Sequence, residues 1–240
     1  MRKNIIKTAL VLLAGLSFAS CDLTEPMQVQ ADKAMIFGTE SGLKTYSWSF
    51  YKMLPNIEDS FLQENGKVDY FVVRKMNNFF IDGAYTAETS TSWSWGNLRN
   101  VNYFLDGLKS KECTVDAKTV AHYEGLARWF RALFYFDKLT TYGEVPWFDK
   151  ELQNYEFDLM YKDSRDVIVK NIIADLDFAY ENIQTTSSTG SSLVSKWAAA
   201  GLKSRVCLFE ASFRKYHKVS GELTADYLFE QAAAAAQLVM

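Results

Sequence analysis

The residues best suited to hold a ligand lie between positions 69 and 95, where aromatic rings alternate with amide and charged side chains in turn-rich sequence. A sugar ring has apolar C–H faces and hydroxyl edges. A sugar site therefore needs flat aromatic surfaces bordered by groups that hydrogen-bond to hydroxyls in pairs. This segment supplies both. The residues expected to contact a ligand are Trp93, Tyr85, Asn78, Asn77, Arg74 and Asp69.

Trp93 is the aromatic surface on which a sugar is expected to stack. It stands two positions before Trp95 and is expected to point another way. We expect Trp95, Phe71 and Phe80 to anchor the segment onto neighbouring helices instead. The alternative is that all of these rings serve only to hold a long loop in place.

The chain lacks the residue patterns of common enzymes. No CxxC, HExxH, GxxxxGK[ST] or GxSxG spacing occurs, and there are only two His, His122 and His217. Asp175 and Asp177 would project about 200° apart on a helix, so they cannot act on one substrate atom. We expect both on a solvated face beside an Arg or Lys. The sequence predicts no catalytic residue, no metal site and no cofactor, and so a protein that is not an enzyme.

The amino-acid composition further limits the classes of protein to which this chain can belong. The 240 residues are 48% hydrophobic and 15% aromatic, which is typical of a folded globular protein. Lys and Arg number 26 against 29 Asp and Glu, giving a net charge of −3. A chain without net positive charge lacks the electrostatic attraction that nucleic acid binding requires, so we expect no nucleic acid partner.

The N-terminal residues predict export and a lipid anchor. Residues 1–20 combine early basic residues with an apolar stretch that is too short to span a bilayer, as in a signal peptide. Small residues at 19 and 20 precede Cys21, as at the cleavage site of bacterial lipoproteins. We expect Cys21 to carry lipid and residues 21–39 to form a tether. The alternative is ordinary cleavage near Ala19, which would leave Cys21 a free thiol.

Residues 40–240 are expected to form an all-α domain. Apolar residues recur at helical spacing over 41–54 and 91–108, whereas 56–90 is rich in turn-forming residues. Four further helices are expected to begin at the N-cap residues Asp116, Ser164, Ser195 and Thr224. Gly143 is expected to end the first of these. Successive helix hairpins predict an α-solenoid of the tetratricopeptide kind with long irregular loops. The last helix ends without a cap, so we expect the N-terminal part of a longer protein.

Four blocks of sequence resemble one family. Residues 125–147, GLARWFRALFYFDKLTTYGEVPW, resemble the signature of the SusD/RagB family, in which an Arg-x-x-Arg-Ala helix leads into Tyr-Gly-x-Val-Pro. Residues 95–102, 165–179 and 196–206 are similar to three further family helices in the same order.

The resemblance implies a surface lipoprotein of the outer membrane. Such proteins have tetratricopeptide-like helix pairs packed on an irregular C-terminal region, which would be missing from this chain. They capture oligosaccharides, or in some members peptides, and deliver them without cleavage to a partner SusC-like TonB-dependent transporter. Two alternatives stay open beside oligosaccharide binding. One is a peptide-binding member of the family, and the other is a tetratricopeptide-like scaffold that binds only protein.

Overall fold

The computed structural model describes residues 32–55, 76, 80–84, 86, 93–151, 161–184 and 193–240. Over these ranges the regular structure is entirely helical, which confirms the predicted fold class. The chain divides into two units, Met1–Asp32 and Lys33–Met240, and every helix described below belongs to the second. None of the helices in the described ranges is long and apolar enough to cross a membrane.

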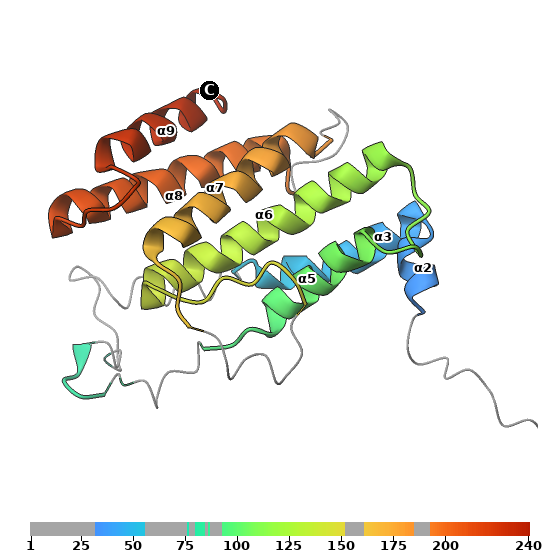
Figure 1. Ribbon diagram of the computed structural model, residues 1–240, viewed down its shortest axis with the longest axis horizontal. Coiled ribbons are helices and arrows are strands. Elements are labelled where there is room, and N and C mark those ends of the chain that lie inside the picture. Colours follow the sequence, from blue (N-terminus) through green and yellow to red (C-terminus); the bar gives the residue numbers. More distant parts are fainter. Residues whose placement is uncertain are drawn as a thin grey trace, which may run out of the picture. The chain divides into compact units, whose positions relative to one another are not determined.

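The described residues form the following helices, which from residue 96 onward pack in the order in which they occur in the chain (Figure 1). They are α2 (Lys33–Phe37), α3 (Glu40–Ser47), the 3-10 helix η1 (Trp48–Met53), α5 (Gly96–Leu108), α6 (Ala117–Tyr142), α7 (Arg165–Asn182), α8 (Lys196–His217) and α9 (Ala225–Gln237). α5 packs on α6, α6 on α7, α7 on α8 and α8 on α9. Each of these neighbours runs antiparallel to the one before (Figure 1). Serial packing of helix hairpins is the arrangement of an α-solenoid.

The four long C-terminal helices begin where their sequence predicts. The side chain of each predicted N-cap accepts a hydrogen bond from a backbone N–H in the first helical turn. These residues are Asp116, Ser164, Ser195 and Thr224. α6 ends at Gly143, whose φ of 80° is a conformation that favours glycine. Local side-chain chemistry therefore sets these helix boundaries.

Two helices differ from their predicted extent. The helix expected over 41–54 is an α-helix only to Ser47, and its remainder is the 3-10 helix η1. The Ser47 hydroxyl donates to the carbonyl of Lys44, a local hydrogen bond that competes with regular α-helix geometry. The helix expected from residue 91 begins at Gly96, because residues 93–95 are non-helical and carry two tryptophans that pack against other rings.

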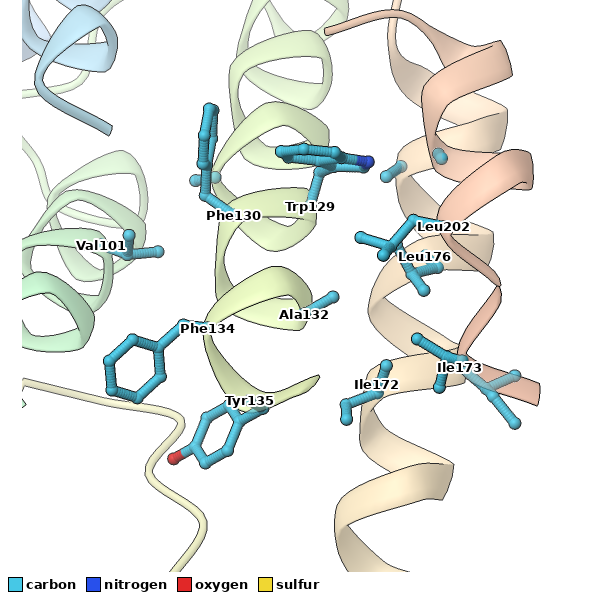
Figure 2. Close-up of a cluster of buried hydrophobic side chains, with 14 of the residues drawn as sticks. Val101, Trp129, Phe130, Ala132, Phe134, Tyr135, Ile172, Ile173, Leu176 and Leu202 are labelled. Atoms are coloured by element: carbon cyan, nitrogen blue, oxygen red, sulfur yellow. The ribbon is translucent and has the colours of Figure 1, made fainter. Parts of the chain in front are cut away.

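α6 is the central helix and is buried on two sides. The apolar stripe of α6 consists of residues three or four positions apart, of which Tyr123, Ala127, Phe130 and Phe134 are buried and Val120 is partly buried. Figure 2 shows Phe130 and Phe134 pointing toward α5, while Trp129 and Ala132 point toward α7. α6 therefore packs against neighbouring helices on two of its faces.

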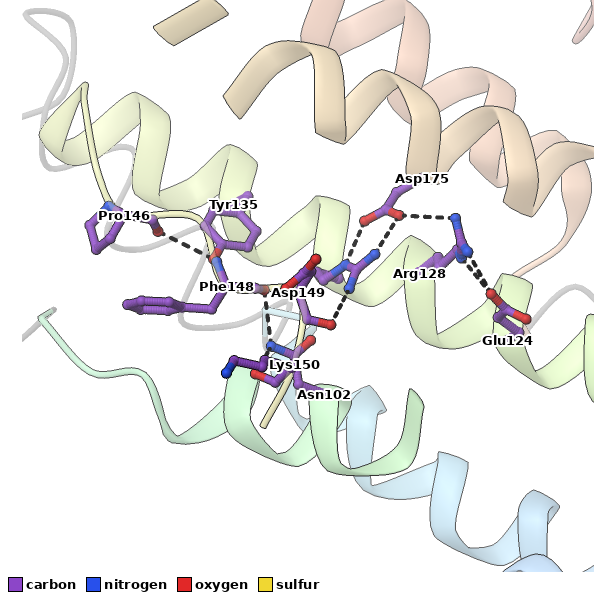
Figure 3. Close-up of polar contacts among 10 residues, drawn as sticks. Asn102, Glu124, Arg128, Tyr135, Pro146, Phe148, Asp149, Lys150 and Asp175 are labelled. Carbon is purple, nitrogen blue, oxygen red and sulfur yellow. Dashed lines mark hydrogen bonds and ion pairs between the residues drawn. The ribbon is translucent and has the colours of Figure 1, made fainter. Parts of the chain in front are cut away.

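A buried ion pair joins α6 to α7 (Figure 3). Arg131 Nε and Nη2 each donate to a carboxylate oxygen of Asp175 at 2.7 Å, and the two residues are 7% and 2% exposed. Burial raises the pKa of Asp175, whereas its hydrogen bonds with Arg131 act to lower it. One guanidinium hydrogen bond to each oxygen favours the ionised carboxylate.

The expected solvated face is therefore wrong for Asp175. Its side chain lies on the face of α7 that packs against α6, where a carboxylate is stable only with a charged partner. Asp177 does match the expectation, since it is 49% exposed and pairs with Lys203 at 2.6 Å.

A second charged cluster crosses from α7 to α8. Glu210 accepts hydrogen bonds from Arg165 of α7 and from Arg214 of its own helix. Arg214 also pairs with Asp166 and donates to the carbonyl of Leu223, just before α9. Glu210 and Arg214 are both buried. The cluster thus connects α7, α8 and the segment that leads into α9.

Two of the cysteines lie in the described ranges and neither forms a disulfide. Cys207 is buried and Cys113 is partly buried, and both are free thiols. Burial raises the pKa of Cys207 to about 11, so this thiol is protonated and unreactive at neutral pH.

Candidate ligand-binding site

Trp93 is the one residue of the sequence-predicted site that falls within the described ranges. Tyr85, Asn78, Asn77, Arg74 and Asp69 lie outside them, as does the expected lipidation site, Cys21. Their part in ligand binding therefore stays a prediction. The site is built below from Trp93 and the residues on which it rests.

The Trp93 side chain is held in place but remains half exposed. Its ring centroid lies 4.8 Å from that of Tyr142 and 5.1 Å from that of Trp95, and the rings cross at 88° and 81°. Two nearly perpendicular contacts restrict the indole to one orientation. Because 51% of Trp93 is still accessible, the ring can offer apolar surface to a ligand.

Trp95 packs inward from the same segment. Its ring lies 5.2–5.6 Å from those of Phe134 and Phe148, and it is partly buried against the core. Its predicted role as an anchor is therefore confirmed. Phe80 is about half exposed, so its anchoring role stays a prediction, and Phe71 lies outside the described residues.

Lys138 lies among these aromatic rings and was missed by sequence reasoning. Its Nζ atom is 5.1 Å from the ring centroid of Phe134, 5.5 Å from that of Tyr142 and 5.9 Å from that of Trp95. The residue is 3% exposed, and burial lowers its pKa. The signal in the sequence was the spacing of 134, 138 and 142, which places all three residues on one face of α6.

The segment that follows α6 is fixed against α5 and α6 (Figure 3). The Tyr135 hydroxyl accepts from the backbone N–H of Phe148 at 2.6 Å and lies 3.3 Å from the carbonyl of Pro146. Asn102 of α5 donates to the carbonyls of Phe148 and Lys150. Burial raises the pKa of Tyr135, so its hydroxyl stays neutral. Phe148 is thereby fixed beneath Trp95.

The described residues contain no group of three or more His, Cys, Asp or Glu placed to hold a metal ion. His122 is partly buried, which lowers its pKa, and its Nδ1 accepts the backbone N–H of Gln184. That contact joins the start of α6 to the end of α7. The arrangement around Trp93 can bind the apolar face of a ring in a ligand.

Comparison with known proteins identifies one family whose model matches this chain. Residues 44–208 match the model of a SusD-like family described as starch-binding and associating with the outer membrane. A search of curated protein sequences gave no match.

Solved structures show the same fold. A SusD-like protein from Bacteroides fragilis is similar to 87% of this chain, with a TM-score of 0.66 and 22% identity. A SusD-like carbohydrate-binding protein from the same organism is similar over 86%, with a TM-score of 0.66 and 18% identity. A laminarin-binding SusD-like protein is similar over 62%, with a TM-score of 0.50 and 22% identity. The chain spans 39%, 41% and 29% of these three proteins, respectively.

Proposed function

This chain belongs to the SusD-like family, and we propose that it binds an oligosaccharide at the outer membrane and delivers it, uncleaved, to a partner SusC-like TonB-dependent transporter. The observation that carries oligosaccharide binding is Trp93, a half-exposed indole oriented by Tyr142 and Trp95. Support also comes from the two similar structures named as carbohydrate-binding and laminarin-binding proteins.

Stacking on Trp93 explains how such a site would recognise sugar. The apolar C–H face of a pyranose would cover the exposed part of the indole, while its hydroxyls need polar partners at the rim. We propose that Tyr85, Asn78, Asn77, Arg74 and Asp69 supply these partners, because they stand close to Trp93 in sequence. Lys138 and the rings below Trp93 would keep the stacking surface rigid.

Replacing Trp93 with alanine is expected to weaken oligosaccharide binding about 5- to 30-fold. Loss of one stacking ring in a partly desolvated site removes about 1–2 kcal/mol of binding free energy. The measurement is isothermal titration of wild type and variant with malto- and laminari-oligosaccharides. Trp48→Ala is the matched control, because Trp48 is 58% exposed on η1.

The control variant is expected to bind as wild type does, and both variants should melt within a few degrees of it. Full affinity of the Trp93→Ala protein for a bound oligosaccharide would contradict a site at this residue. Binding of peptides, with no binding of either sugar series, would instead favour the peptide-binding alternative.

We also propose that Cys21 anchors the protein in the membrane through lipid. Cys21→Ala is expected to move the protein from the detergent phase to the aqueous phase on Triton X-114 partitioning. Each buried lipid CH₂ contributes about 0.8 kcal/mol to membrane affinity, so loss of the acyl chains has a large effect. Cys113→Ala serves as the control, since that thiol belongs to the folded domain. Unchanged partitioning of the Cys21→Ala protein would contradict lipidation there.

A further inference from the structure

His122 holds the end of α7 against the start of α6. It lies in the second turn of α6, and its Nδ1 atom is 3.0 Å from the backbone nitrogen of Gln184, two residues beyond the end of α7. The side-chain amide of Gln184 also donates to the carbonyl of Lys118, one turn earlier on α6, at 3.2 Å. Gln184 thus makes two hydrogen bonds to α6, one of them to a group that can be protonated.

The contact between His122 and Gln184 requires a neutral imidazole. A backbone N–H can only donate a hydrogen bond, so the Nδ1 atom that faces it must carry a lone pair. The proton of neutral His122 is therefore on Nε2. A protonated imidazole has N–H groups at both positions and cannot accept a hydrogen bond. Protonation of His122 thus replaces this hydrogen bond by two N–H groups that face each other.

Glu40 of α3 favours the protonated form of His122. Partial burial lowers the pKa of His122 below its ordinary value, and the negative charge of Glu40 acts in the opposite direction and raises it. α3 packs against α6, which brings this carboxylate to the start of α6. The ring of Tyr123 contacts the imidazole edge to face, with centroids 4.8 Å apart, and burial raises the pKa of its hydroxyl, which stays neutral. Further charged side chains line the adjacent cavity and are Lys118 of α6, Glu181 of α7 and Lys196 of α8.

We propose that His122 is a pH-dependent switch, which holds Gln184 when it is neutral and, when it is protonated, releases Gln184 and is stabilised by the charge of Glu40. Histidine is suited to this role because it titrates between about pH 5 and 8. Residues 180–184 form one wall of a cavity of about 470 Å³ between α6, α7 and α8. Acid therefore loosens this wall where it meets the start of α6.

Acid weakens the contact because the unfolded chain binds the proton more readily. The pKa of His122 is about 6.5 in the unfolded chain and lower in the folded protein. The stability that the contact contributes is therefore complete above about pH 6.5 and is lost as the pH falls through the pKa of the folded protein. Local release of Gln184 has the same direction.

The test is hydrogen exchange of the Gln184 backbone amide, followed by NMR between about pH 7.5 and about pH 5 and corrected for the intrinsic exchange rate at each pH. In wild type, protection is expected to fall roughly fivefold at the acidic end, because one hydrogen bond is lost. His122→Asn should keep protection constant, since the asparagine Oδ1 stands in the place of Nδ1 and accepts without titrating. His217→Asn, at an exposed histidine of α8, is the matched control and should behave as wild type does.

Glu40→Gln tests the part played by α3. Removal of this charge should lower the pH at which Gln184 is released and leave its protection at about pH 7.5 as in wild type. Thermal melts establish that each variant is folded before exchange is measured. Constant protection of Gln184 in wild type would overturn the proposal, as would the wild-type pH dependence in His122→Asn. An unchanged pH of release in Glu40→Gln would overturn the role of Glu40.

Discussion

Replacing Asp175 with asparagine is expected to lower the free energy of unfolding by about 3–5 kcal/mol. The substitution preserves side-chain shape but leaves the buried guanidinium of Arg131 without its counter-charge, which is the costly way to break a buried ion pair. Arg128, at 3.6 Å from the same carboxylate, loses a favourable contact too. Urea unfolding followed by circular dichroism measures the effect.

The matched control for this prediction is two residues away on the same helix. Asp177→Asn breaks a partly exposed pair with Lys203 and should change the free energy of unfolding by less than about 1 kcal/mol. The double variant Arg131→Met, Asp175→Leu should recover most of the lost stability, because it removes both charges and restores apolar packing. Equal effects of the Asp175 and Asp177 substitutions would show that the α6–α7 pair is not buried in solution.

Trp95→Ala is expected to cost about 3 kcal/mol of folding stability. Its indole contacts the rings of Phe134, Tyr135 and Phe148, and removal leaves a cavity that the fixed segment after α6 cannot fill. Oligosaccharide binding should weaken as well, since Trp93 loses one of the two rings that orient it. Thermal melts and titrations of the same preparation measure both effects.

Trp48→Ala again provides the comparison, because it removes an indole of equal size from an exposed position. Its effect on stability should stay below about 1 kcal/mol. A Trp95→Ala protein that melts like the Trp48→Ala protein would contradict the anchoring role of Trp95.

Helix boundaries could be predicted because each depends on a few adjacent residues. Asp116, Ser164, Ser195 and Thr224 cap their helices through atoms at most three residues away, and Gly143 ends α6 by its own backbone conformation. The order of the hairpins follows from these boundaries, since elements that are consecutive in the chain are usually neighbours in space.

Features that depend on distant partners could not be predicted. Asp175 and Asp177 have the same side chain on the same helix, and only the position of Arg131, 44 residues earlier, distinguishes them. Tyr135 lies outside the apolar stripe of α6, yet its hydroxyl fixes the segment that supports Trp95. Of the candidate site, sequence reasoning selected Trp93 and its inward-facing neighbour Trp95, but not Lys138 or Tyr142, which contact these rings.

The buried ion pairs also determine which mutations this fold can accumulate over evolutionary time. A single change that removes the charge of Arg131 or of Asp175 leaves the other buried without its main partner, so we expect it to survive only when that partner changes too. Partners on different helices, such as Arg131 and Asp175, should therefore change together as sequences diverge. The exposed pair of Lys170 and Glu222 imposes no such restriction, and each member can vary alone.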